Sequence, residues 1–154
     1  MNRELRTLVP AALCAMLLAL APGPAQANDA DRAVNGMLGP MTGQQTYEQI
    51  CAGCHMPGGK GAVGAGTYPA FVGNPAVASS NYMAVTILNG RRNMPAFAKP
   101  VDGGGWFVPT WLTEQQIADV INYIRGNFGN KYRDKISAEQ VRALRPPPAP
   151  AQKK

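Results

Sequence analysis

The stretch Cys51-Ala52-Gly53-Cys54-His55 decides how the rest of this sequence is read, and His55 is the only histidine among 154 residues. Cys-x-x-Cys-His is the attachment signature of c-type haem, because two thiols at this spacing can add across the two vinyl groups of one porphyrin. The histidine that follows is then held under the macrocycle, where a ring nitrogen can bind the iron. The sequence therefore predicts one covalent haem c on Cys51 and Cys54, with His55 as its proximal axial ligand.

Three other uses of a Cys-x-x-Cys pair fit the surrounding sequence less well. A thioredoxin-like redox motif follows a strand in a βαβ pattern, whereas this pair ends a polar, helix-like stretch and precedes a glycine-rich loop. Structural zinc needs four ligands, and the chain that remains after export has no further cysteine or histidine. A structural disulfide is disfavoured by the two-residue spacing. Haem attachment is the favoured interpretation, with these three as alternatives.

Residues 1–27 have the parts of a secretory signal peptide: two arginines, an apolar run over 8–21, and a small-x-small site ending at Ala27. The run is shorter than the roughly 20 residues that span a bilayer. We therefore expect cleavage after Ala27 and no membrane span in the mature protein, with an uncleaved anchor as the alternative. Cleavage removes Cys14 and leaves only the two motif cysteines, which suits an oxidising compartment. The expected location is the periplasm.

Length and charge limit the classes of partner. The residues after the signal, about 127, suit one domain. The whole chain has 15 basic and nine acidic residues, a formal charge of +6, and loss of the signal removes two arginines and one glutamate. The basic residues are scattered and the chain is exported, so we expect no nucleic acid. A modest positive charge favours docking against an acidic surface, although it also simply keeps a protein soluble.

Helix signals lie on both sides of the motif. Residues 28–42 are expected to form a flexible arm, after which a helix can begin near Gly43 and lead to the motif. A second helix is expected over Ser80–Leu88, ended by Asn89-Gly90. Between them, residues 57–73 are so rich in glycine that no regular element is expected; a loop that wraps a flat cofactor has such a composition.

The last long helix has the clearest pattern. Thr113 and Gln116 form a capping box, and Gly126 or Gly129 ends the helix. Apolar residues recur between them at helical spacing: Ile117, Val120, Ile121, Ile124 and Phe128. A short helix is expected near Ser137 to Leu144, and there is no β-strand alternation of any length. The prediction is an all-α domain over 43–130, with three to four short helices around one haem. A C-terminal extension over 131–154 ends in a proline-rich, disordered tail.

The sixth iron ligand decides between electron transfer and catalysis. With one histidine, the candidates are methionines: Met37, Met41, Met56, Met83 and Met94. Met94 is favoured because it lies in a non-helical segment 39 residues after His55, with Pro95 stiffening the backbone behind it. Met83 on a helix, or an open iron, is the alternative. A thioether stabilises the reduced iron and closes it to substrate.

These features together resemble a class I monohaem cytochrome c over about residues 43–130. The resemblance is carried, in order, by the motif, the glycine-rich loop, Asn93-Met94-Pro95-Ala96-Phe97 and the helix of 112–125. Within that group the sequence is most similar to the small cytochrome subunits and domains that serve bacterial alcohol, sugar and aldehyde dehydrogenases.

The resemblance implies a role for each matched residue. Cys51 and Cys54 would carry the thioethers, His55 would be proximal and Met94 distal. The carbonyl of Pro69 would accept a hydrogen bond from the second ring nitrogen of His55 and so orient the ring. The first and last helices would cross closely, with their packing formed by Tyr47, Ile50, Val120, Ile121 and Tyr123.

The expected function is that of a periplasmic one-electron carrier and not an enzyme. It would accept electrons from a dehydrogenase, as its subunit or its partner, and pass them to a respiratory acceptor, without a small-molecule substrate of its own. The alternatives are a peroxidase-like haem enzyme or gas sensor with a labile sixth ligand, and a soluble donor to a terminal oxidase or reductase. A distal acid–base residue would favour the enzyme, and the absence of a second histidine counts against it.

Two features near Met94 are left without a fixed role. Residues 99–109 look like an insertion that could shield the haem edge, bind a propionate through Trp106 or contact a partner, or that is simply anchored by aromatic packing. Arg91 and Arg92 could neutralise propionates or face an acidic partner, or they could be a solvated pair.

Overall fold

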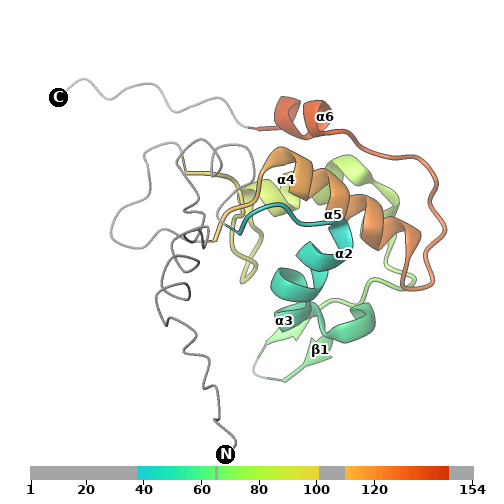
Figure 1. The fold of residues 1–154 in the computed structure, drawn as a ribbon. Coiled ribbons are helices and arrows are strands. Elements are labelled where there is room, and N and C mark those ends of the chain that lie inside the picture. The colour runs from blue at the N-terminus through green and yellow to red at the C-terminus, as the bar shows by residue number, and fades with distance from the viewer. Residues whose placement is uncertain (1–37, 65, 101–109, 146–154) are drawn as a thin grey trace, which may run out of the picture.

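The structure, a computed structural model, describes residues 38–64, 66–100 and 110–145. It confirms the predicted all-α class, with one small two-stranded ribbon added (Figure 1). The elements in chain order are α2 (Gly43–Thr46), a π-helical turn (Tyr47–Cys51), α3 (Ala52–His55), a 3-10 turn (Pro57–Gly59), β1 (Ala62–Val63), β2 (Thr67–Tyr68), a second 3-10 turn (Pro75–Ala78), α4 (Ser80–Asn89), α5 (Glu114–Gly126) and α6 (Ala138–Ala143).

Helix α5 crosses α2 at close range, as Figure 1 shows. Gly43 lies directly against the backbone carbonyl of Asp119, where a side-chain carbon would overlap it. One turn further along, the Tyr47 ring contacts the Tyr123 ring, with centroids 5.9 Å apart. The apolar side chains of α5 that were expected to face inward are buried: Ile117, Val120, Ile121 and Ile124. Ile50, which was expected to pack between the two helices, is half-buried.

Polar caps fix where the helices begin. The predicted box of Thr113 and Gln116 is present at the start of α5. Two further boxes of the same kind start α2 and α6, and in each the side chain of the capping residue accepts from the backbone three positions on. Helix α4 ends before Gly90, whose φ of 72° favours glycine. Because each cap is local, the helix starts follow from the sequence.

The loop after the motif is more regular than predicted. Residues 57–73 contain a 3-10 turn and the ribbon of β1 and β2, in which Ala62 pairs with Tyr68 and Val63 with Thr67. The prediction of no regular element was therefore wrong. Its glycines permit the structure instead of preventing it: Gly61, with a φ of 68°, lets the chain lie directly against the Tyr68 carbonyl, where a Cβ would overlap.

The described parts of the N-terminal arm and of the C-terminal extension both contact the domain. Met41 packs against the core, and Gln116 donates a hydrogen bond to the Gly39 carbonyl at 2.8 Å. At the other end, the expected short helix is confirmed as α6, whose Val141 is fully buried. The predicted signal peptide, most of the flexible arm, the core of the insertion and the proline-rich tail lie outside the described residues.

Two polar side chains of α5 hold the segment that joins it to α6. The Asn122 side-chain amide donates to the Ile136 carbonyl at 2.9 Å and accepts from its N–H at 3.0 Å. The buried Arg125 guanidinium donates to three backbone carbonyls, those of Val77, Ala78 and Asp134. It also pairs with the Asp134 carboxylate at 2.8 Å. Arg125 thus connects α5 both to the second 3-10 turn and to the segment that follows α5.

Within residues 38–64, 66–100 and 110–145, no helix is long and apolar enough to cross a membrane.

Candidate haem-binding site

The Cys-x-x-Cys-His motif lies on one continuous helical run that starts at Gly43 and ends at His55. Its middle turn is π-helical, because the Ala52 N–H donates to the Tyr47 carbonyl five residues earlier. Such a bulge is rare and is frequent at functional sites. Both cysteines are free thiols, and Cys51 is half-buried against the core whereas Cys54 is exposed.

The electrostatics of Cys51 argue against a reactive redox pair. Burial raises the pKa of the Cys51 thiol to about 12, and the charge of Cys54 adds to the rise. Thioredoxin-like cysteines have lowered pKa values, because the thiolate is the nucleophile. The zinc alternative also lacks support, since the described residues contain no group of three or more His, Cys, Asp or Glu side chains that could hold a metal ion.

The His55 ring is oriented from two sides. Its Nδ1 lies 3.0 Å from the Pro69 carbonyl oxygen, which can only accept, so Nδ1 carries the proton. In a neutral imidazole this leaves the lone pair on Nε2, the atom free to bind iron. The Phe71 ring stacks on the imidazole at 4.6 Å, with an interplanar angle of 23°. The tautomer and the plane of the ring are thus both set by the chain.

The Pro69 carbonyl is itself held in place. The N–H of Phe71 donates to the Gly59 carbonyl at 2.9 Å, and the Asn74 side chain donates to the Ala70 carbonyl at 3.0 Å. A Cβ on Gly61 would come within 2.5 Å of the Ala70 nitrogen, so the two chain segments are in direct backbone contact. This rigidity lets a backbone carbonyl act as a fixed partner for His55.

Sequence reasoning missed the support that Tyr47 gives to the residue after His55. Met56 has a φ of 63° and a ψ of 153°, a conformation that is strained for any residue but glycine. The Tyr47 hydroxyl donates to the Met56 carbonyl at 2.6 Å. Burial is the main cause that raises the pKa of Tyr47, so this hydroxyl remains protonated. A short sequence motif could not have predicted this contact, because Tyr47 and Met56 are nine positions apart and the backbone at Met56 is strained.

Met94 lies on a loop whose backbone is fixed from both directions. The Met94 N–H donates to the Arg91 carbonyl, and the Arg91 N–H donates to the Met94 carbonyl, each at 3.0 Å. A Cβ on Gly90 would be only 2.6 Å from the Met94 carbonyl oxygen, so glycine is required there. The Met94 side chain is half-buried and packs against the core.

The other methionines have different surroundings. Met83 on α4 is a buried core residue, and Met41 is half-buried on the core in front of α2. Met56 follows His55 directly, on the strained backbone described above. Met37 lies outside the described residues.

The residues present fit a covalently attached haem. The chain offers two free thiols at the required spacing, an imidazole whose Nε2 is left unprotonated by a fixed carbonyl, and a thioether on a separate, rigid loop. Soft sulfur and imidazole ligands are those of a cytochrome c iron.

Residues 40–127 match the cytochrome c family profile. The chain belongs to the cytochrome c family. Its fold is therefore the class I cytochrome c fold expected from the resemblance, and its cofactor is covalent haem c.

Known relatives include cytochrome subunits of dehydrogenases. The chain is 32% identical to the cytochrome c subunit of a quinone-dependent alcohol dehydrogenase of Gluconacetobacter polyoxogenes, over 79% of this chain and 26% of the relative. It is 34% identical to the gluconate 2-dehydrogenase cytochrome c subunit of Pantoea cypripedii, over 68% of this chain and 24% of the relative. It is also 34% identical to the fructose dehydrogenase cytochrome subunit of Gluconobacter japonicus, over 77% of this chain and 25% of the relative. The chain thus spans about a quarter of the length of these relatives.

Proposed function

We propose that this cytochrome c is a periplasmic one-electron carrier that accepts electrons from a dehydrogenase, as a subunit or a partner, and passes them to a respiratory acceptor. Cys51 and Cys54 bind the haem covalently, His55 is the proximal ligand and Met94 the distal ligand. The observation that carries the ligand assignment is the contact between His55 Nδ1 and the Pro69 carbonyl, which leaves Nε2 as the metal-binding atom.

The chain's own residues have three tasks in this function. When bound, haem c takes up and gives up one electron at its iron. Pro69 and Phe71 hold the His55 ring in one orientation, so its bond to the metal needs little rearrangement between oxidation states. Met94 would hold the haem iron through its thioether, and so would exclude water and small ligands. A site closed in this way transfers electrons and performs no further chemistry.

The proposed partner and location come from other observations. Relatives of this chain are named as cytochrome subunits of alcohol, gluconate and fructose dehydrogenases. Residues 1–27 have the pattern of an export signal. A dehydrogenase that oxidises an alcohol, a sugar or a sugar acid is therefore the proposed electron source, and the respiratory acceptor follows from the periplasmic location.

Optical spectra of the exported holoprotein test the axial ligands. The wild type should show sharp α and β bands when reduced, a weak sulfur-to-iron charge-transfer band when oxidised, and no response to carbon monoxide. Met94→Ala should keep the haem attached but lose the charge-transfer band and bind carbon monoxide. Met83→Leu, which alters a buried core methionine, is the matched control and should keep the band. A band that survives in Met94→Ala would exclude Met94, and a wild-type response to carbon monoxide would favour the enzyme or sensor.

The electron source is tested separately. Purified catalytic subunits of alcohol, gluconate and fructose dehydrogenases are mixed in turn with the oxidised cytochrome and their own substrates, and haem reduction is followed by absorbance. Fast reduction by one of them supports the dehydrogenase partner. If none reduces the haem while a small chemical reductant does, the carrier function stands and the proposed partner is wrong.

A further inference from the structure

A pocket lies where the start of α5 meets the end of α6, and its lining contains none of the proposed haem ligands. Three separate parts of the chain form it, all within the described residues. The side chains that matter here are Lys99, Pro100, Trp111, Glu114, Arg142 and Arg145. Its volume of about 460 Å³ is in the range of roughly 300–1,000 Å³ found for pockets that hold small molecules. The electron-carrier function makes no use of this pocket.

The pocket is positively charged. Lys99, Arg142 and Arg145 contribute three positive side chains, whereas Glu114 contributes the single carboxylate. Among the described residues, the ion pair at this pocket joins Arg145 to Glu114, and neither Lys99 nor Arg142 takes part in one. Glu139, three positions before Arg142 on α6, is exposed and forms no ion pair with it. Two cations are therefore left without a counter-charge in a concave site, where the positive potential is concentrated.

Arg145 is held in place but is poorly supplied with hydrogen bonds. Its Nε is buried and lies 2.7 Å from Oε1 of Glu114, yet the two atoms are not aligned for a hydrogen bond. Its Nη1 donates to the Lys99 carbonyl over a long 3.5 Å. A buried donor without a good acceptor is costly, and the fork of a guanidinium matches the two oxygens of a carboxylate. A carboxylate bound in the pocket would thus satisfy donors that the chain itself does not.

An aromatic ring gives the pocket an apolar part. Trp111 is only 8% exposed, so packing fixes its ring, and Nζ of Lys99 lies 5.1 Å from the ring centroid. Pro100 adds a second rigid apolar surface. Ligand pockets typically combine apolar walls with a few polar groups that fix the orientation of the ligand. The lining therefore suits a molecule with one anionic group and an apolar body, whereas inorganic phosphate would use the cations but not the ring.

We propose that this pocket binds a small organic carboxylate. The carboxylate group would lie against Arg142 and Arg145, and the apolar body against Trp111 and Pro100. A free acid fits better than an acidic segment of another protein, because the cations surround a concave site and do not form a raised surface. The inference does not depend on which residues bind the haem iron.

Titration of the reduced holoprotein with benzoate tests the pocket. The holoprotein already carries its haem, so the carboxylates of the haem are not mistaken for the ligand. Backbone amide signals and the Trp111 indole signal are followed by NMR, with benzamide as the neutral probe and inorganic phosphate as the anion without a ring. We expect saturable shifts near residues 97–100, 111–114 and 141–145, weaker binding as salt rises, and little response to the other two probes. No saturable shift with benzoate, or a stronger response to phosphate, would overturn the proposal.

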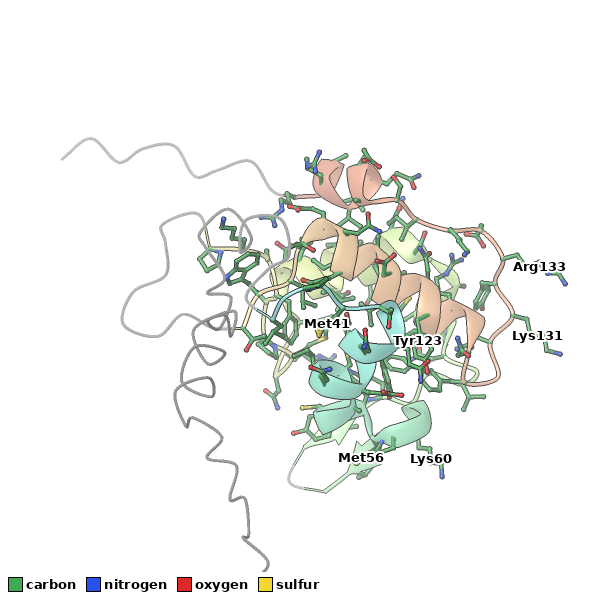
Figure 2. The ribbon with its side chains drawn as sticks, in the orientation of Figure 1. Met41, Met56, Lys60, Tyr123, Lys131 and Arg133 are labelled. Carbon is green, nitrogen blue, oxygen red and sulfur yellow. The ribbon has the colours of Figure 1, made fainter. Side chains whose placement is uncertain are left out.

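Two charge-matched variants separate the pocket from net charge. K99Q/R142Q removes the two unpaired cations and should weaken benzoate binding about fivefold, the loss expected for two exposed ion pairs. K131Q/R133Q removes the same charge from the segment after α5, where Figure 2 shows both side chains projecting outward.

The control residues follow the far end of α5, and a helix of 13 residues is about 20 Å long. K131Q/R133Q should therefore change benzoate binding by less than about twofold. An equal loss in both variants would overturn the proposal. So would binding of a capped oligoglutamate peptide that K99Q/R142Q abolishes, without any binding of benzoate, which would assign the pocket to an acidic segment of another protein.

Discussion

The crossing of α2 and α5 predicts a severe effect of a single methyl group at Gly43. A Cβ there would overlap the carbonyl oxygen of Asp119, and it would lie 2.6 Å from the carbonyl carbon and 3.0 Å from Cβ of Tyr123. The nearest obstacles are backbone atoms, which cannot move to another rotamer. In Gly43→Ala the two helices must therefore separate.

The free-energy cost of Gly43→Ala follows from how tightly the crossing of α2 and α5 is packed. Overpacking of a well-packed interface costs about 1–3 kcal/mol, and a backbone clash belongs at the upper end of that range. Alanine recovers up to about 1 kcal/mol through its helix propensity, although less at the first residue of a helix. The expected net destabilisation is about 2 kcal/mol, which lowers the melting temperature by about 8–16 °C for a domain of this size.

Gly126→Ala is the matched control for this substitution. Gly126 is the last residue of α5, it is exposed, and a Cβ there would meet nothing within 4 Å. The same change should therefore stabilise the protein by about 0.5 kcal/mol. Both variants are compared as holoproteins by guanidinium unfolding followed by circular dichroism. A Gly43→Ala variant within about 0.5 kcal/mol of the wild type would refute the close crossing.

Three further predictions concern contacts and the cofactor. Tyr47→Phe keeps the ring but leaves the Met56 carbonyl without its donor, and chemical unfolding should show a loss of about 1–2 kcal/mol; no loss would mean that water replaces the hydroxyl. Arg125→Met leaves three carbonyls without their donor and should cost about 3–5 kcal/mol, whereas Asp134→Asn, at an exposed carboxylate, should cost about 1 kcal/mol or less by the same assay. A chain with both motif cysteines changed to serine cannot attach haem, and it should melt without a cooperative transition in circular dichroism; a sharp transition would show that the protein core suffices.

Local signals in the sequence were enough to predict the helices. The box of Thr113 and Gln116 and the apolar repeat after it specify α5, and Gly90 ends α4, because caps and periodicity act within one or two turns. Cys51, Cys54 and His55 were predicted as site residues from one contiguous motif. The structure places Pro69 next to His55, as the family resemblance implied. The assignment of Met94 rests on loop geometry and stays a prediction.

Contacts between distant segments could not be read from the sequence. Arg125 lies in the last turn of an amphipathic helix, and no sequence signal predicted its burial: it is 1% exposed and donates to carbonyls about 48 residues earlier in the chain. The ribbon of β1 and β2 was missed because two-residue strands carry no alternation, and their pairing depends on the close approach at Gly61. Such features arise from the packing of the whole chain.

The supports of His55 connect the ligand geometry to the stability of the whole domain. Phe71, which stacks on His55, also contacts the Tyr47 ring at 6.0 Å and the Phe128 ring at 6.1 Å. Tyr47 in turn packs on Tyr123 of α5, so one aromatic cluster joins the imidazole to the helix crossing. Because packed aromatic groups have few alternative positions, loosening the crossing at Gly43 should also loosen His55. The glycine at the crossing therefore supports the proposed iron ligand, His55, as well as the fold.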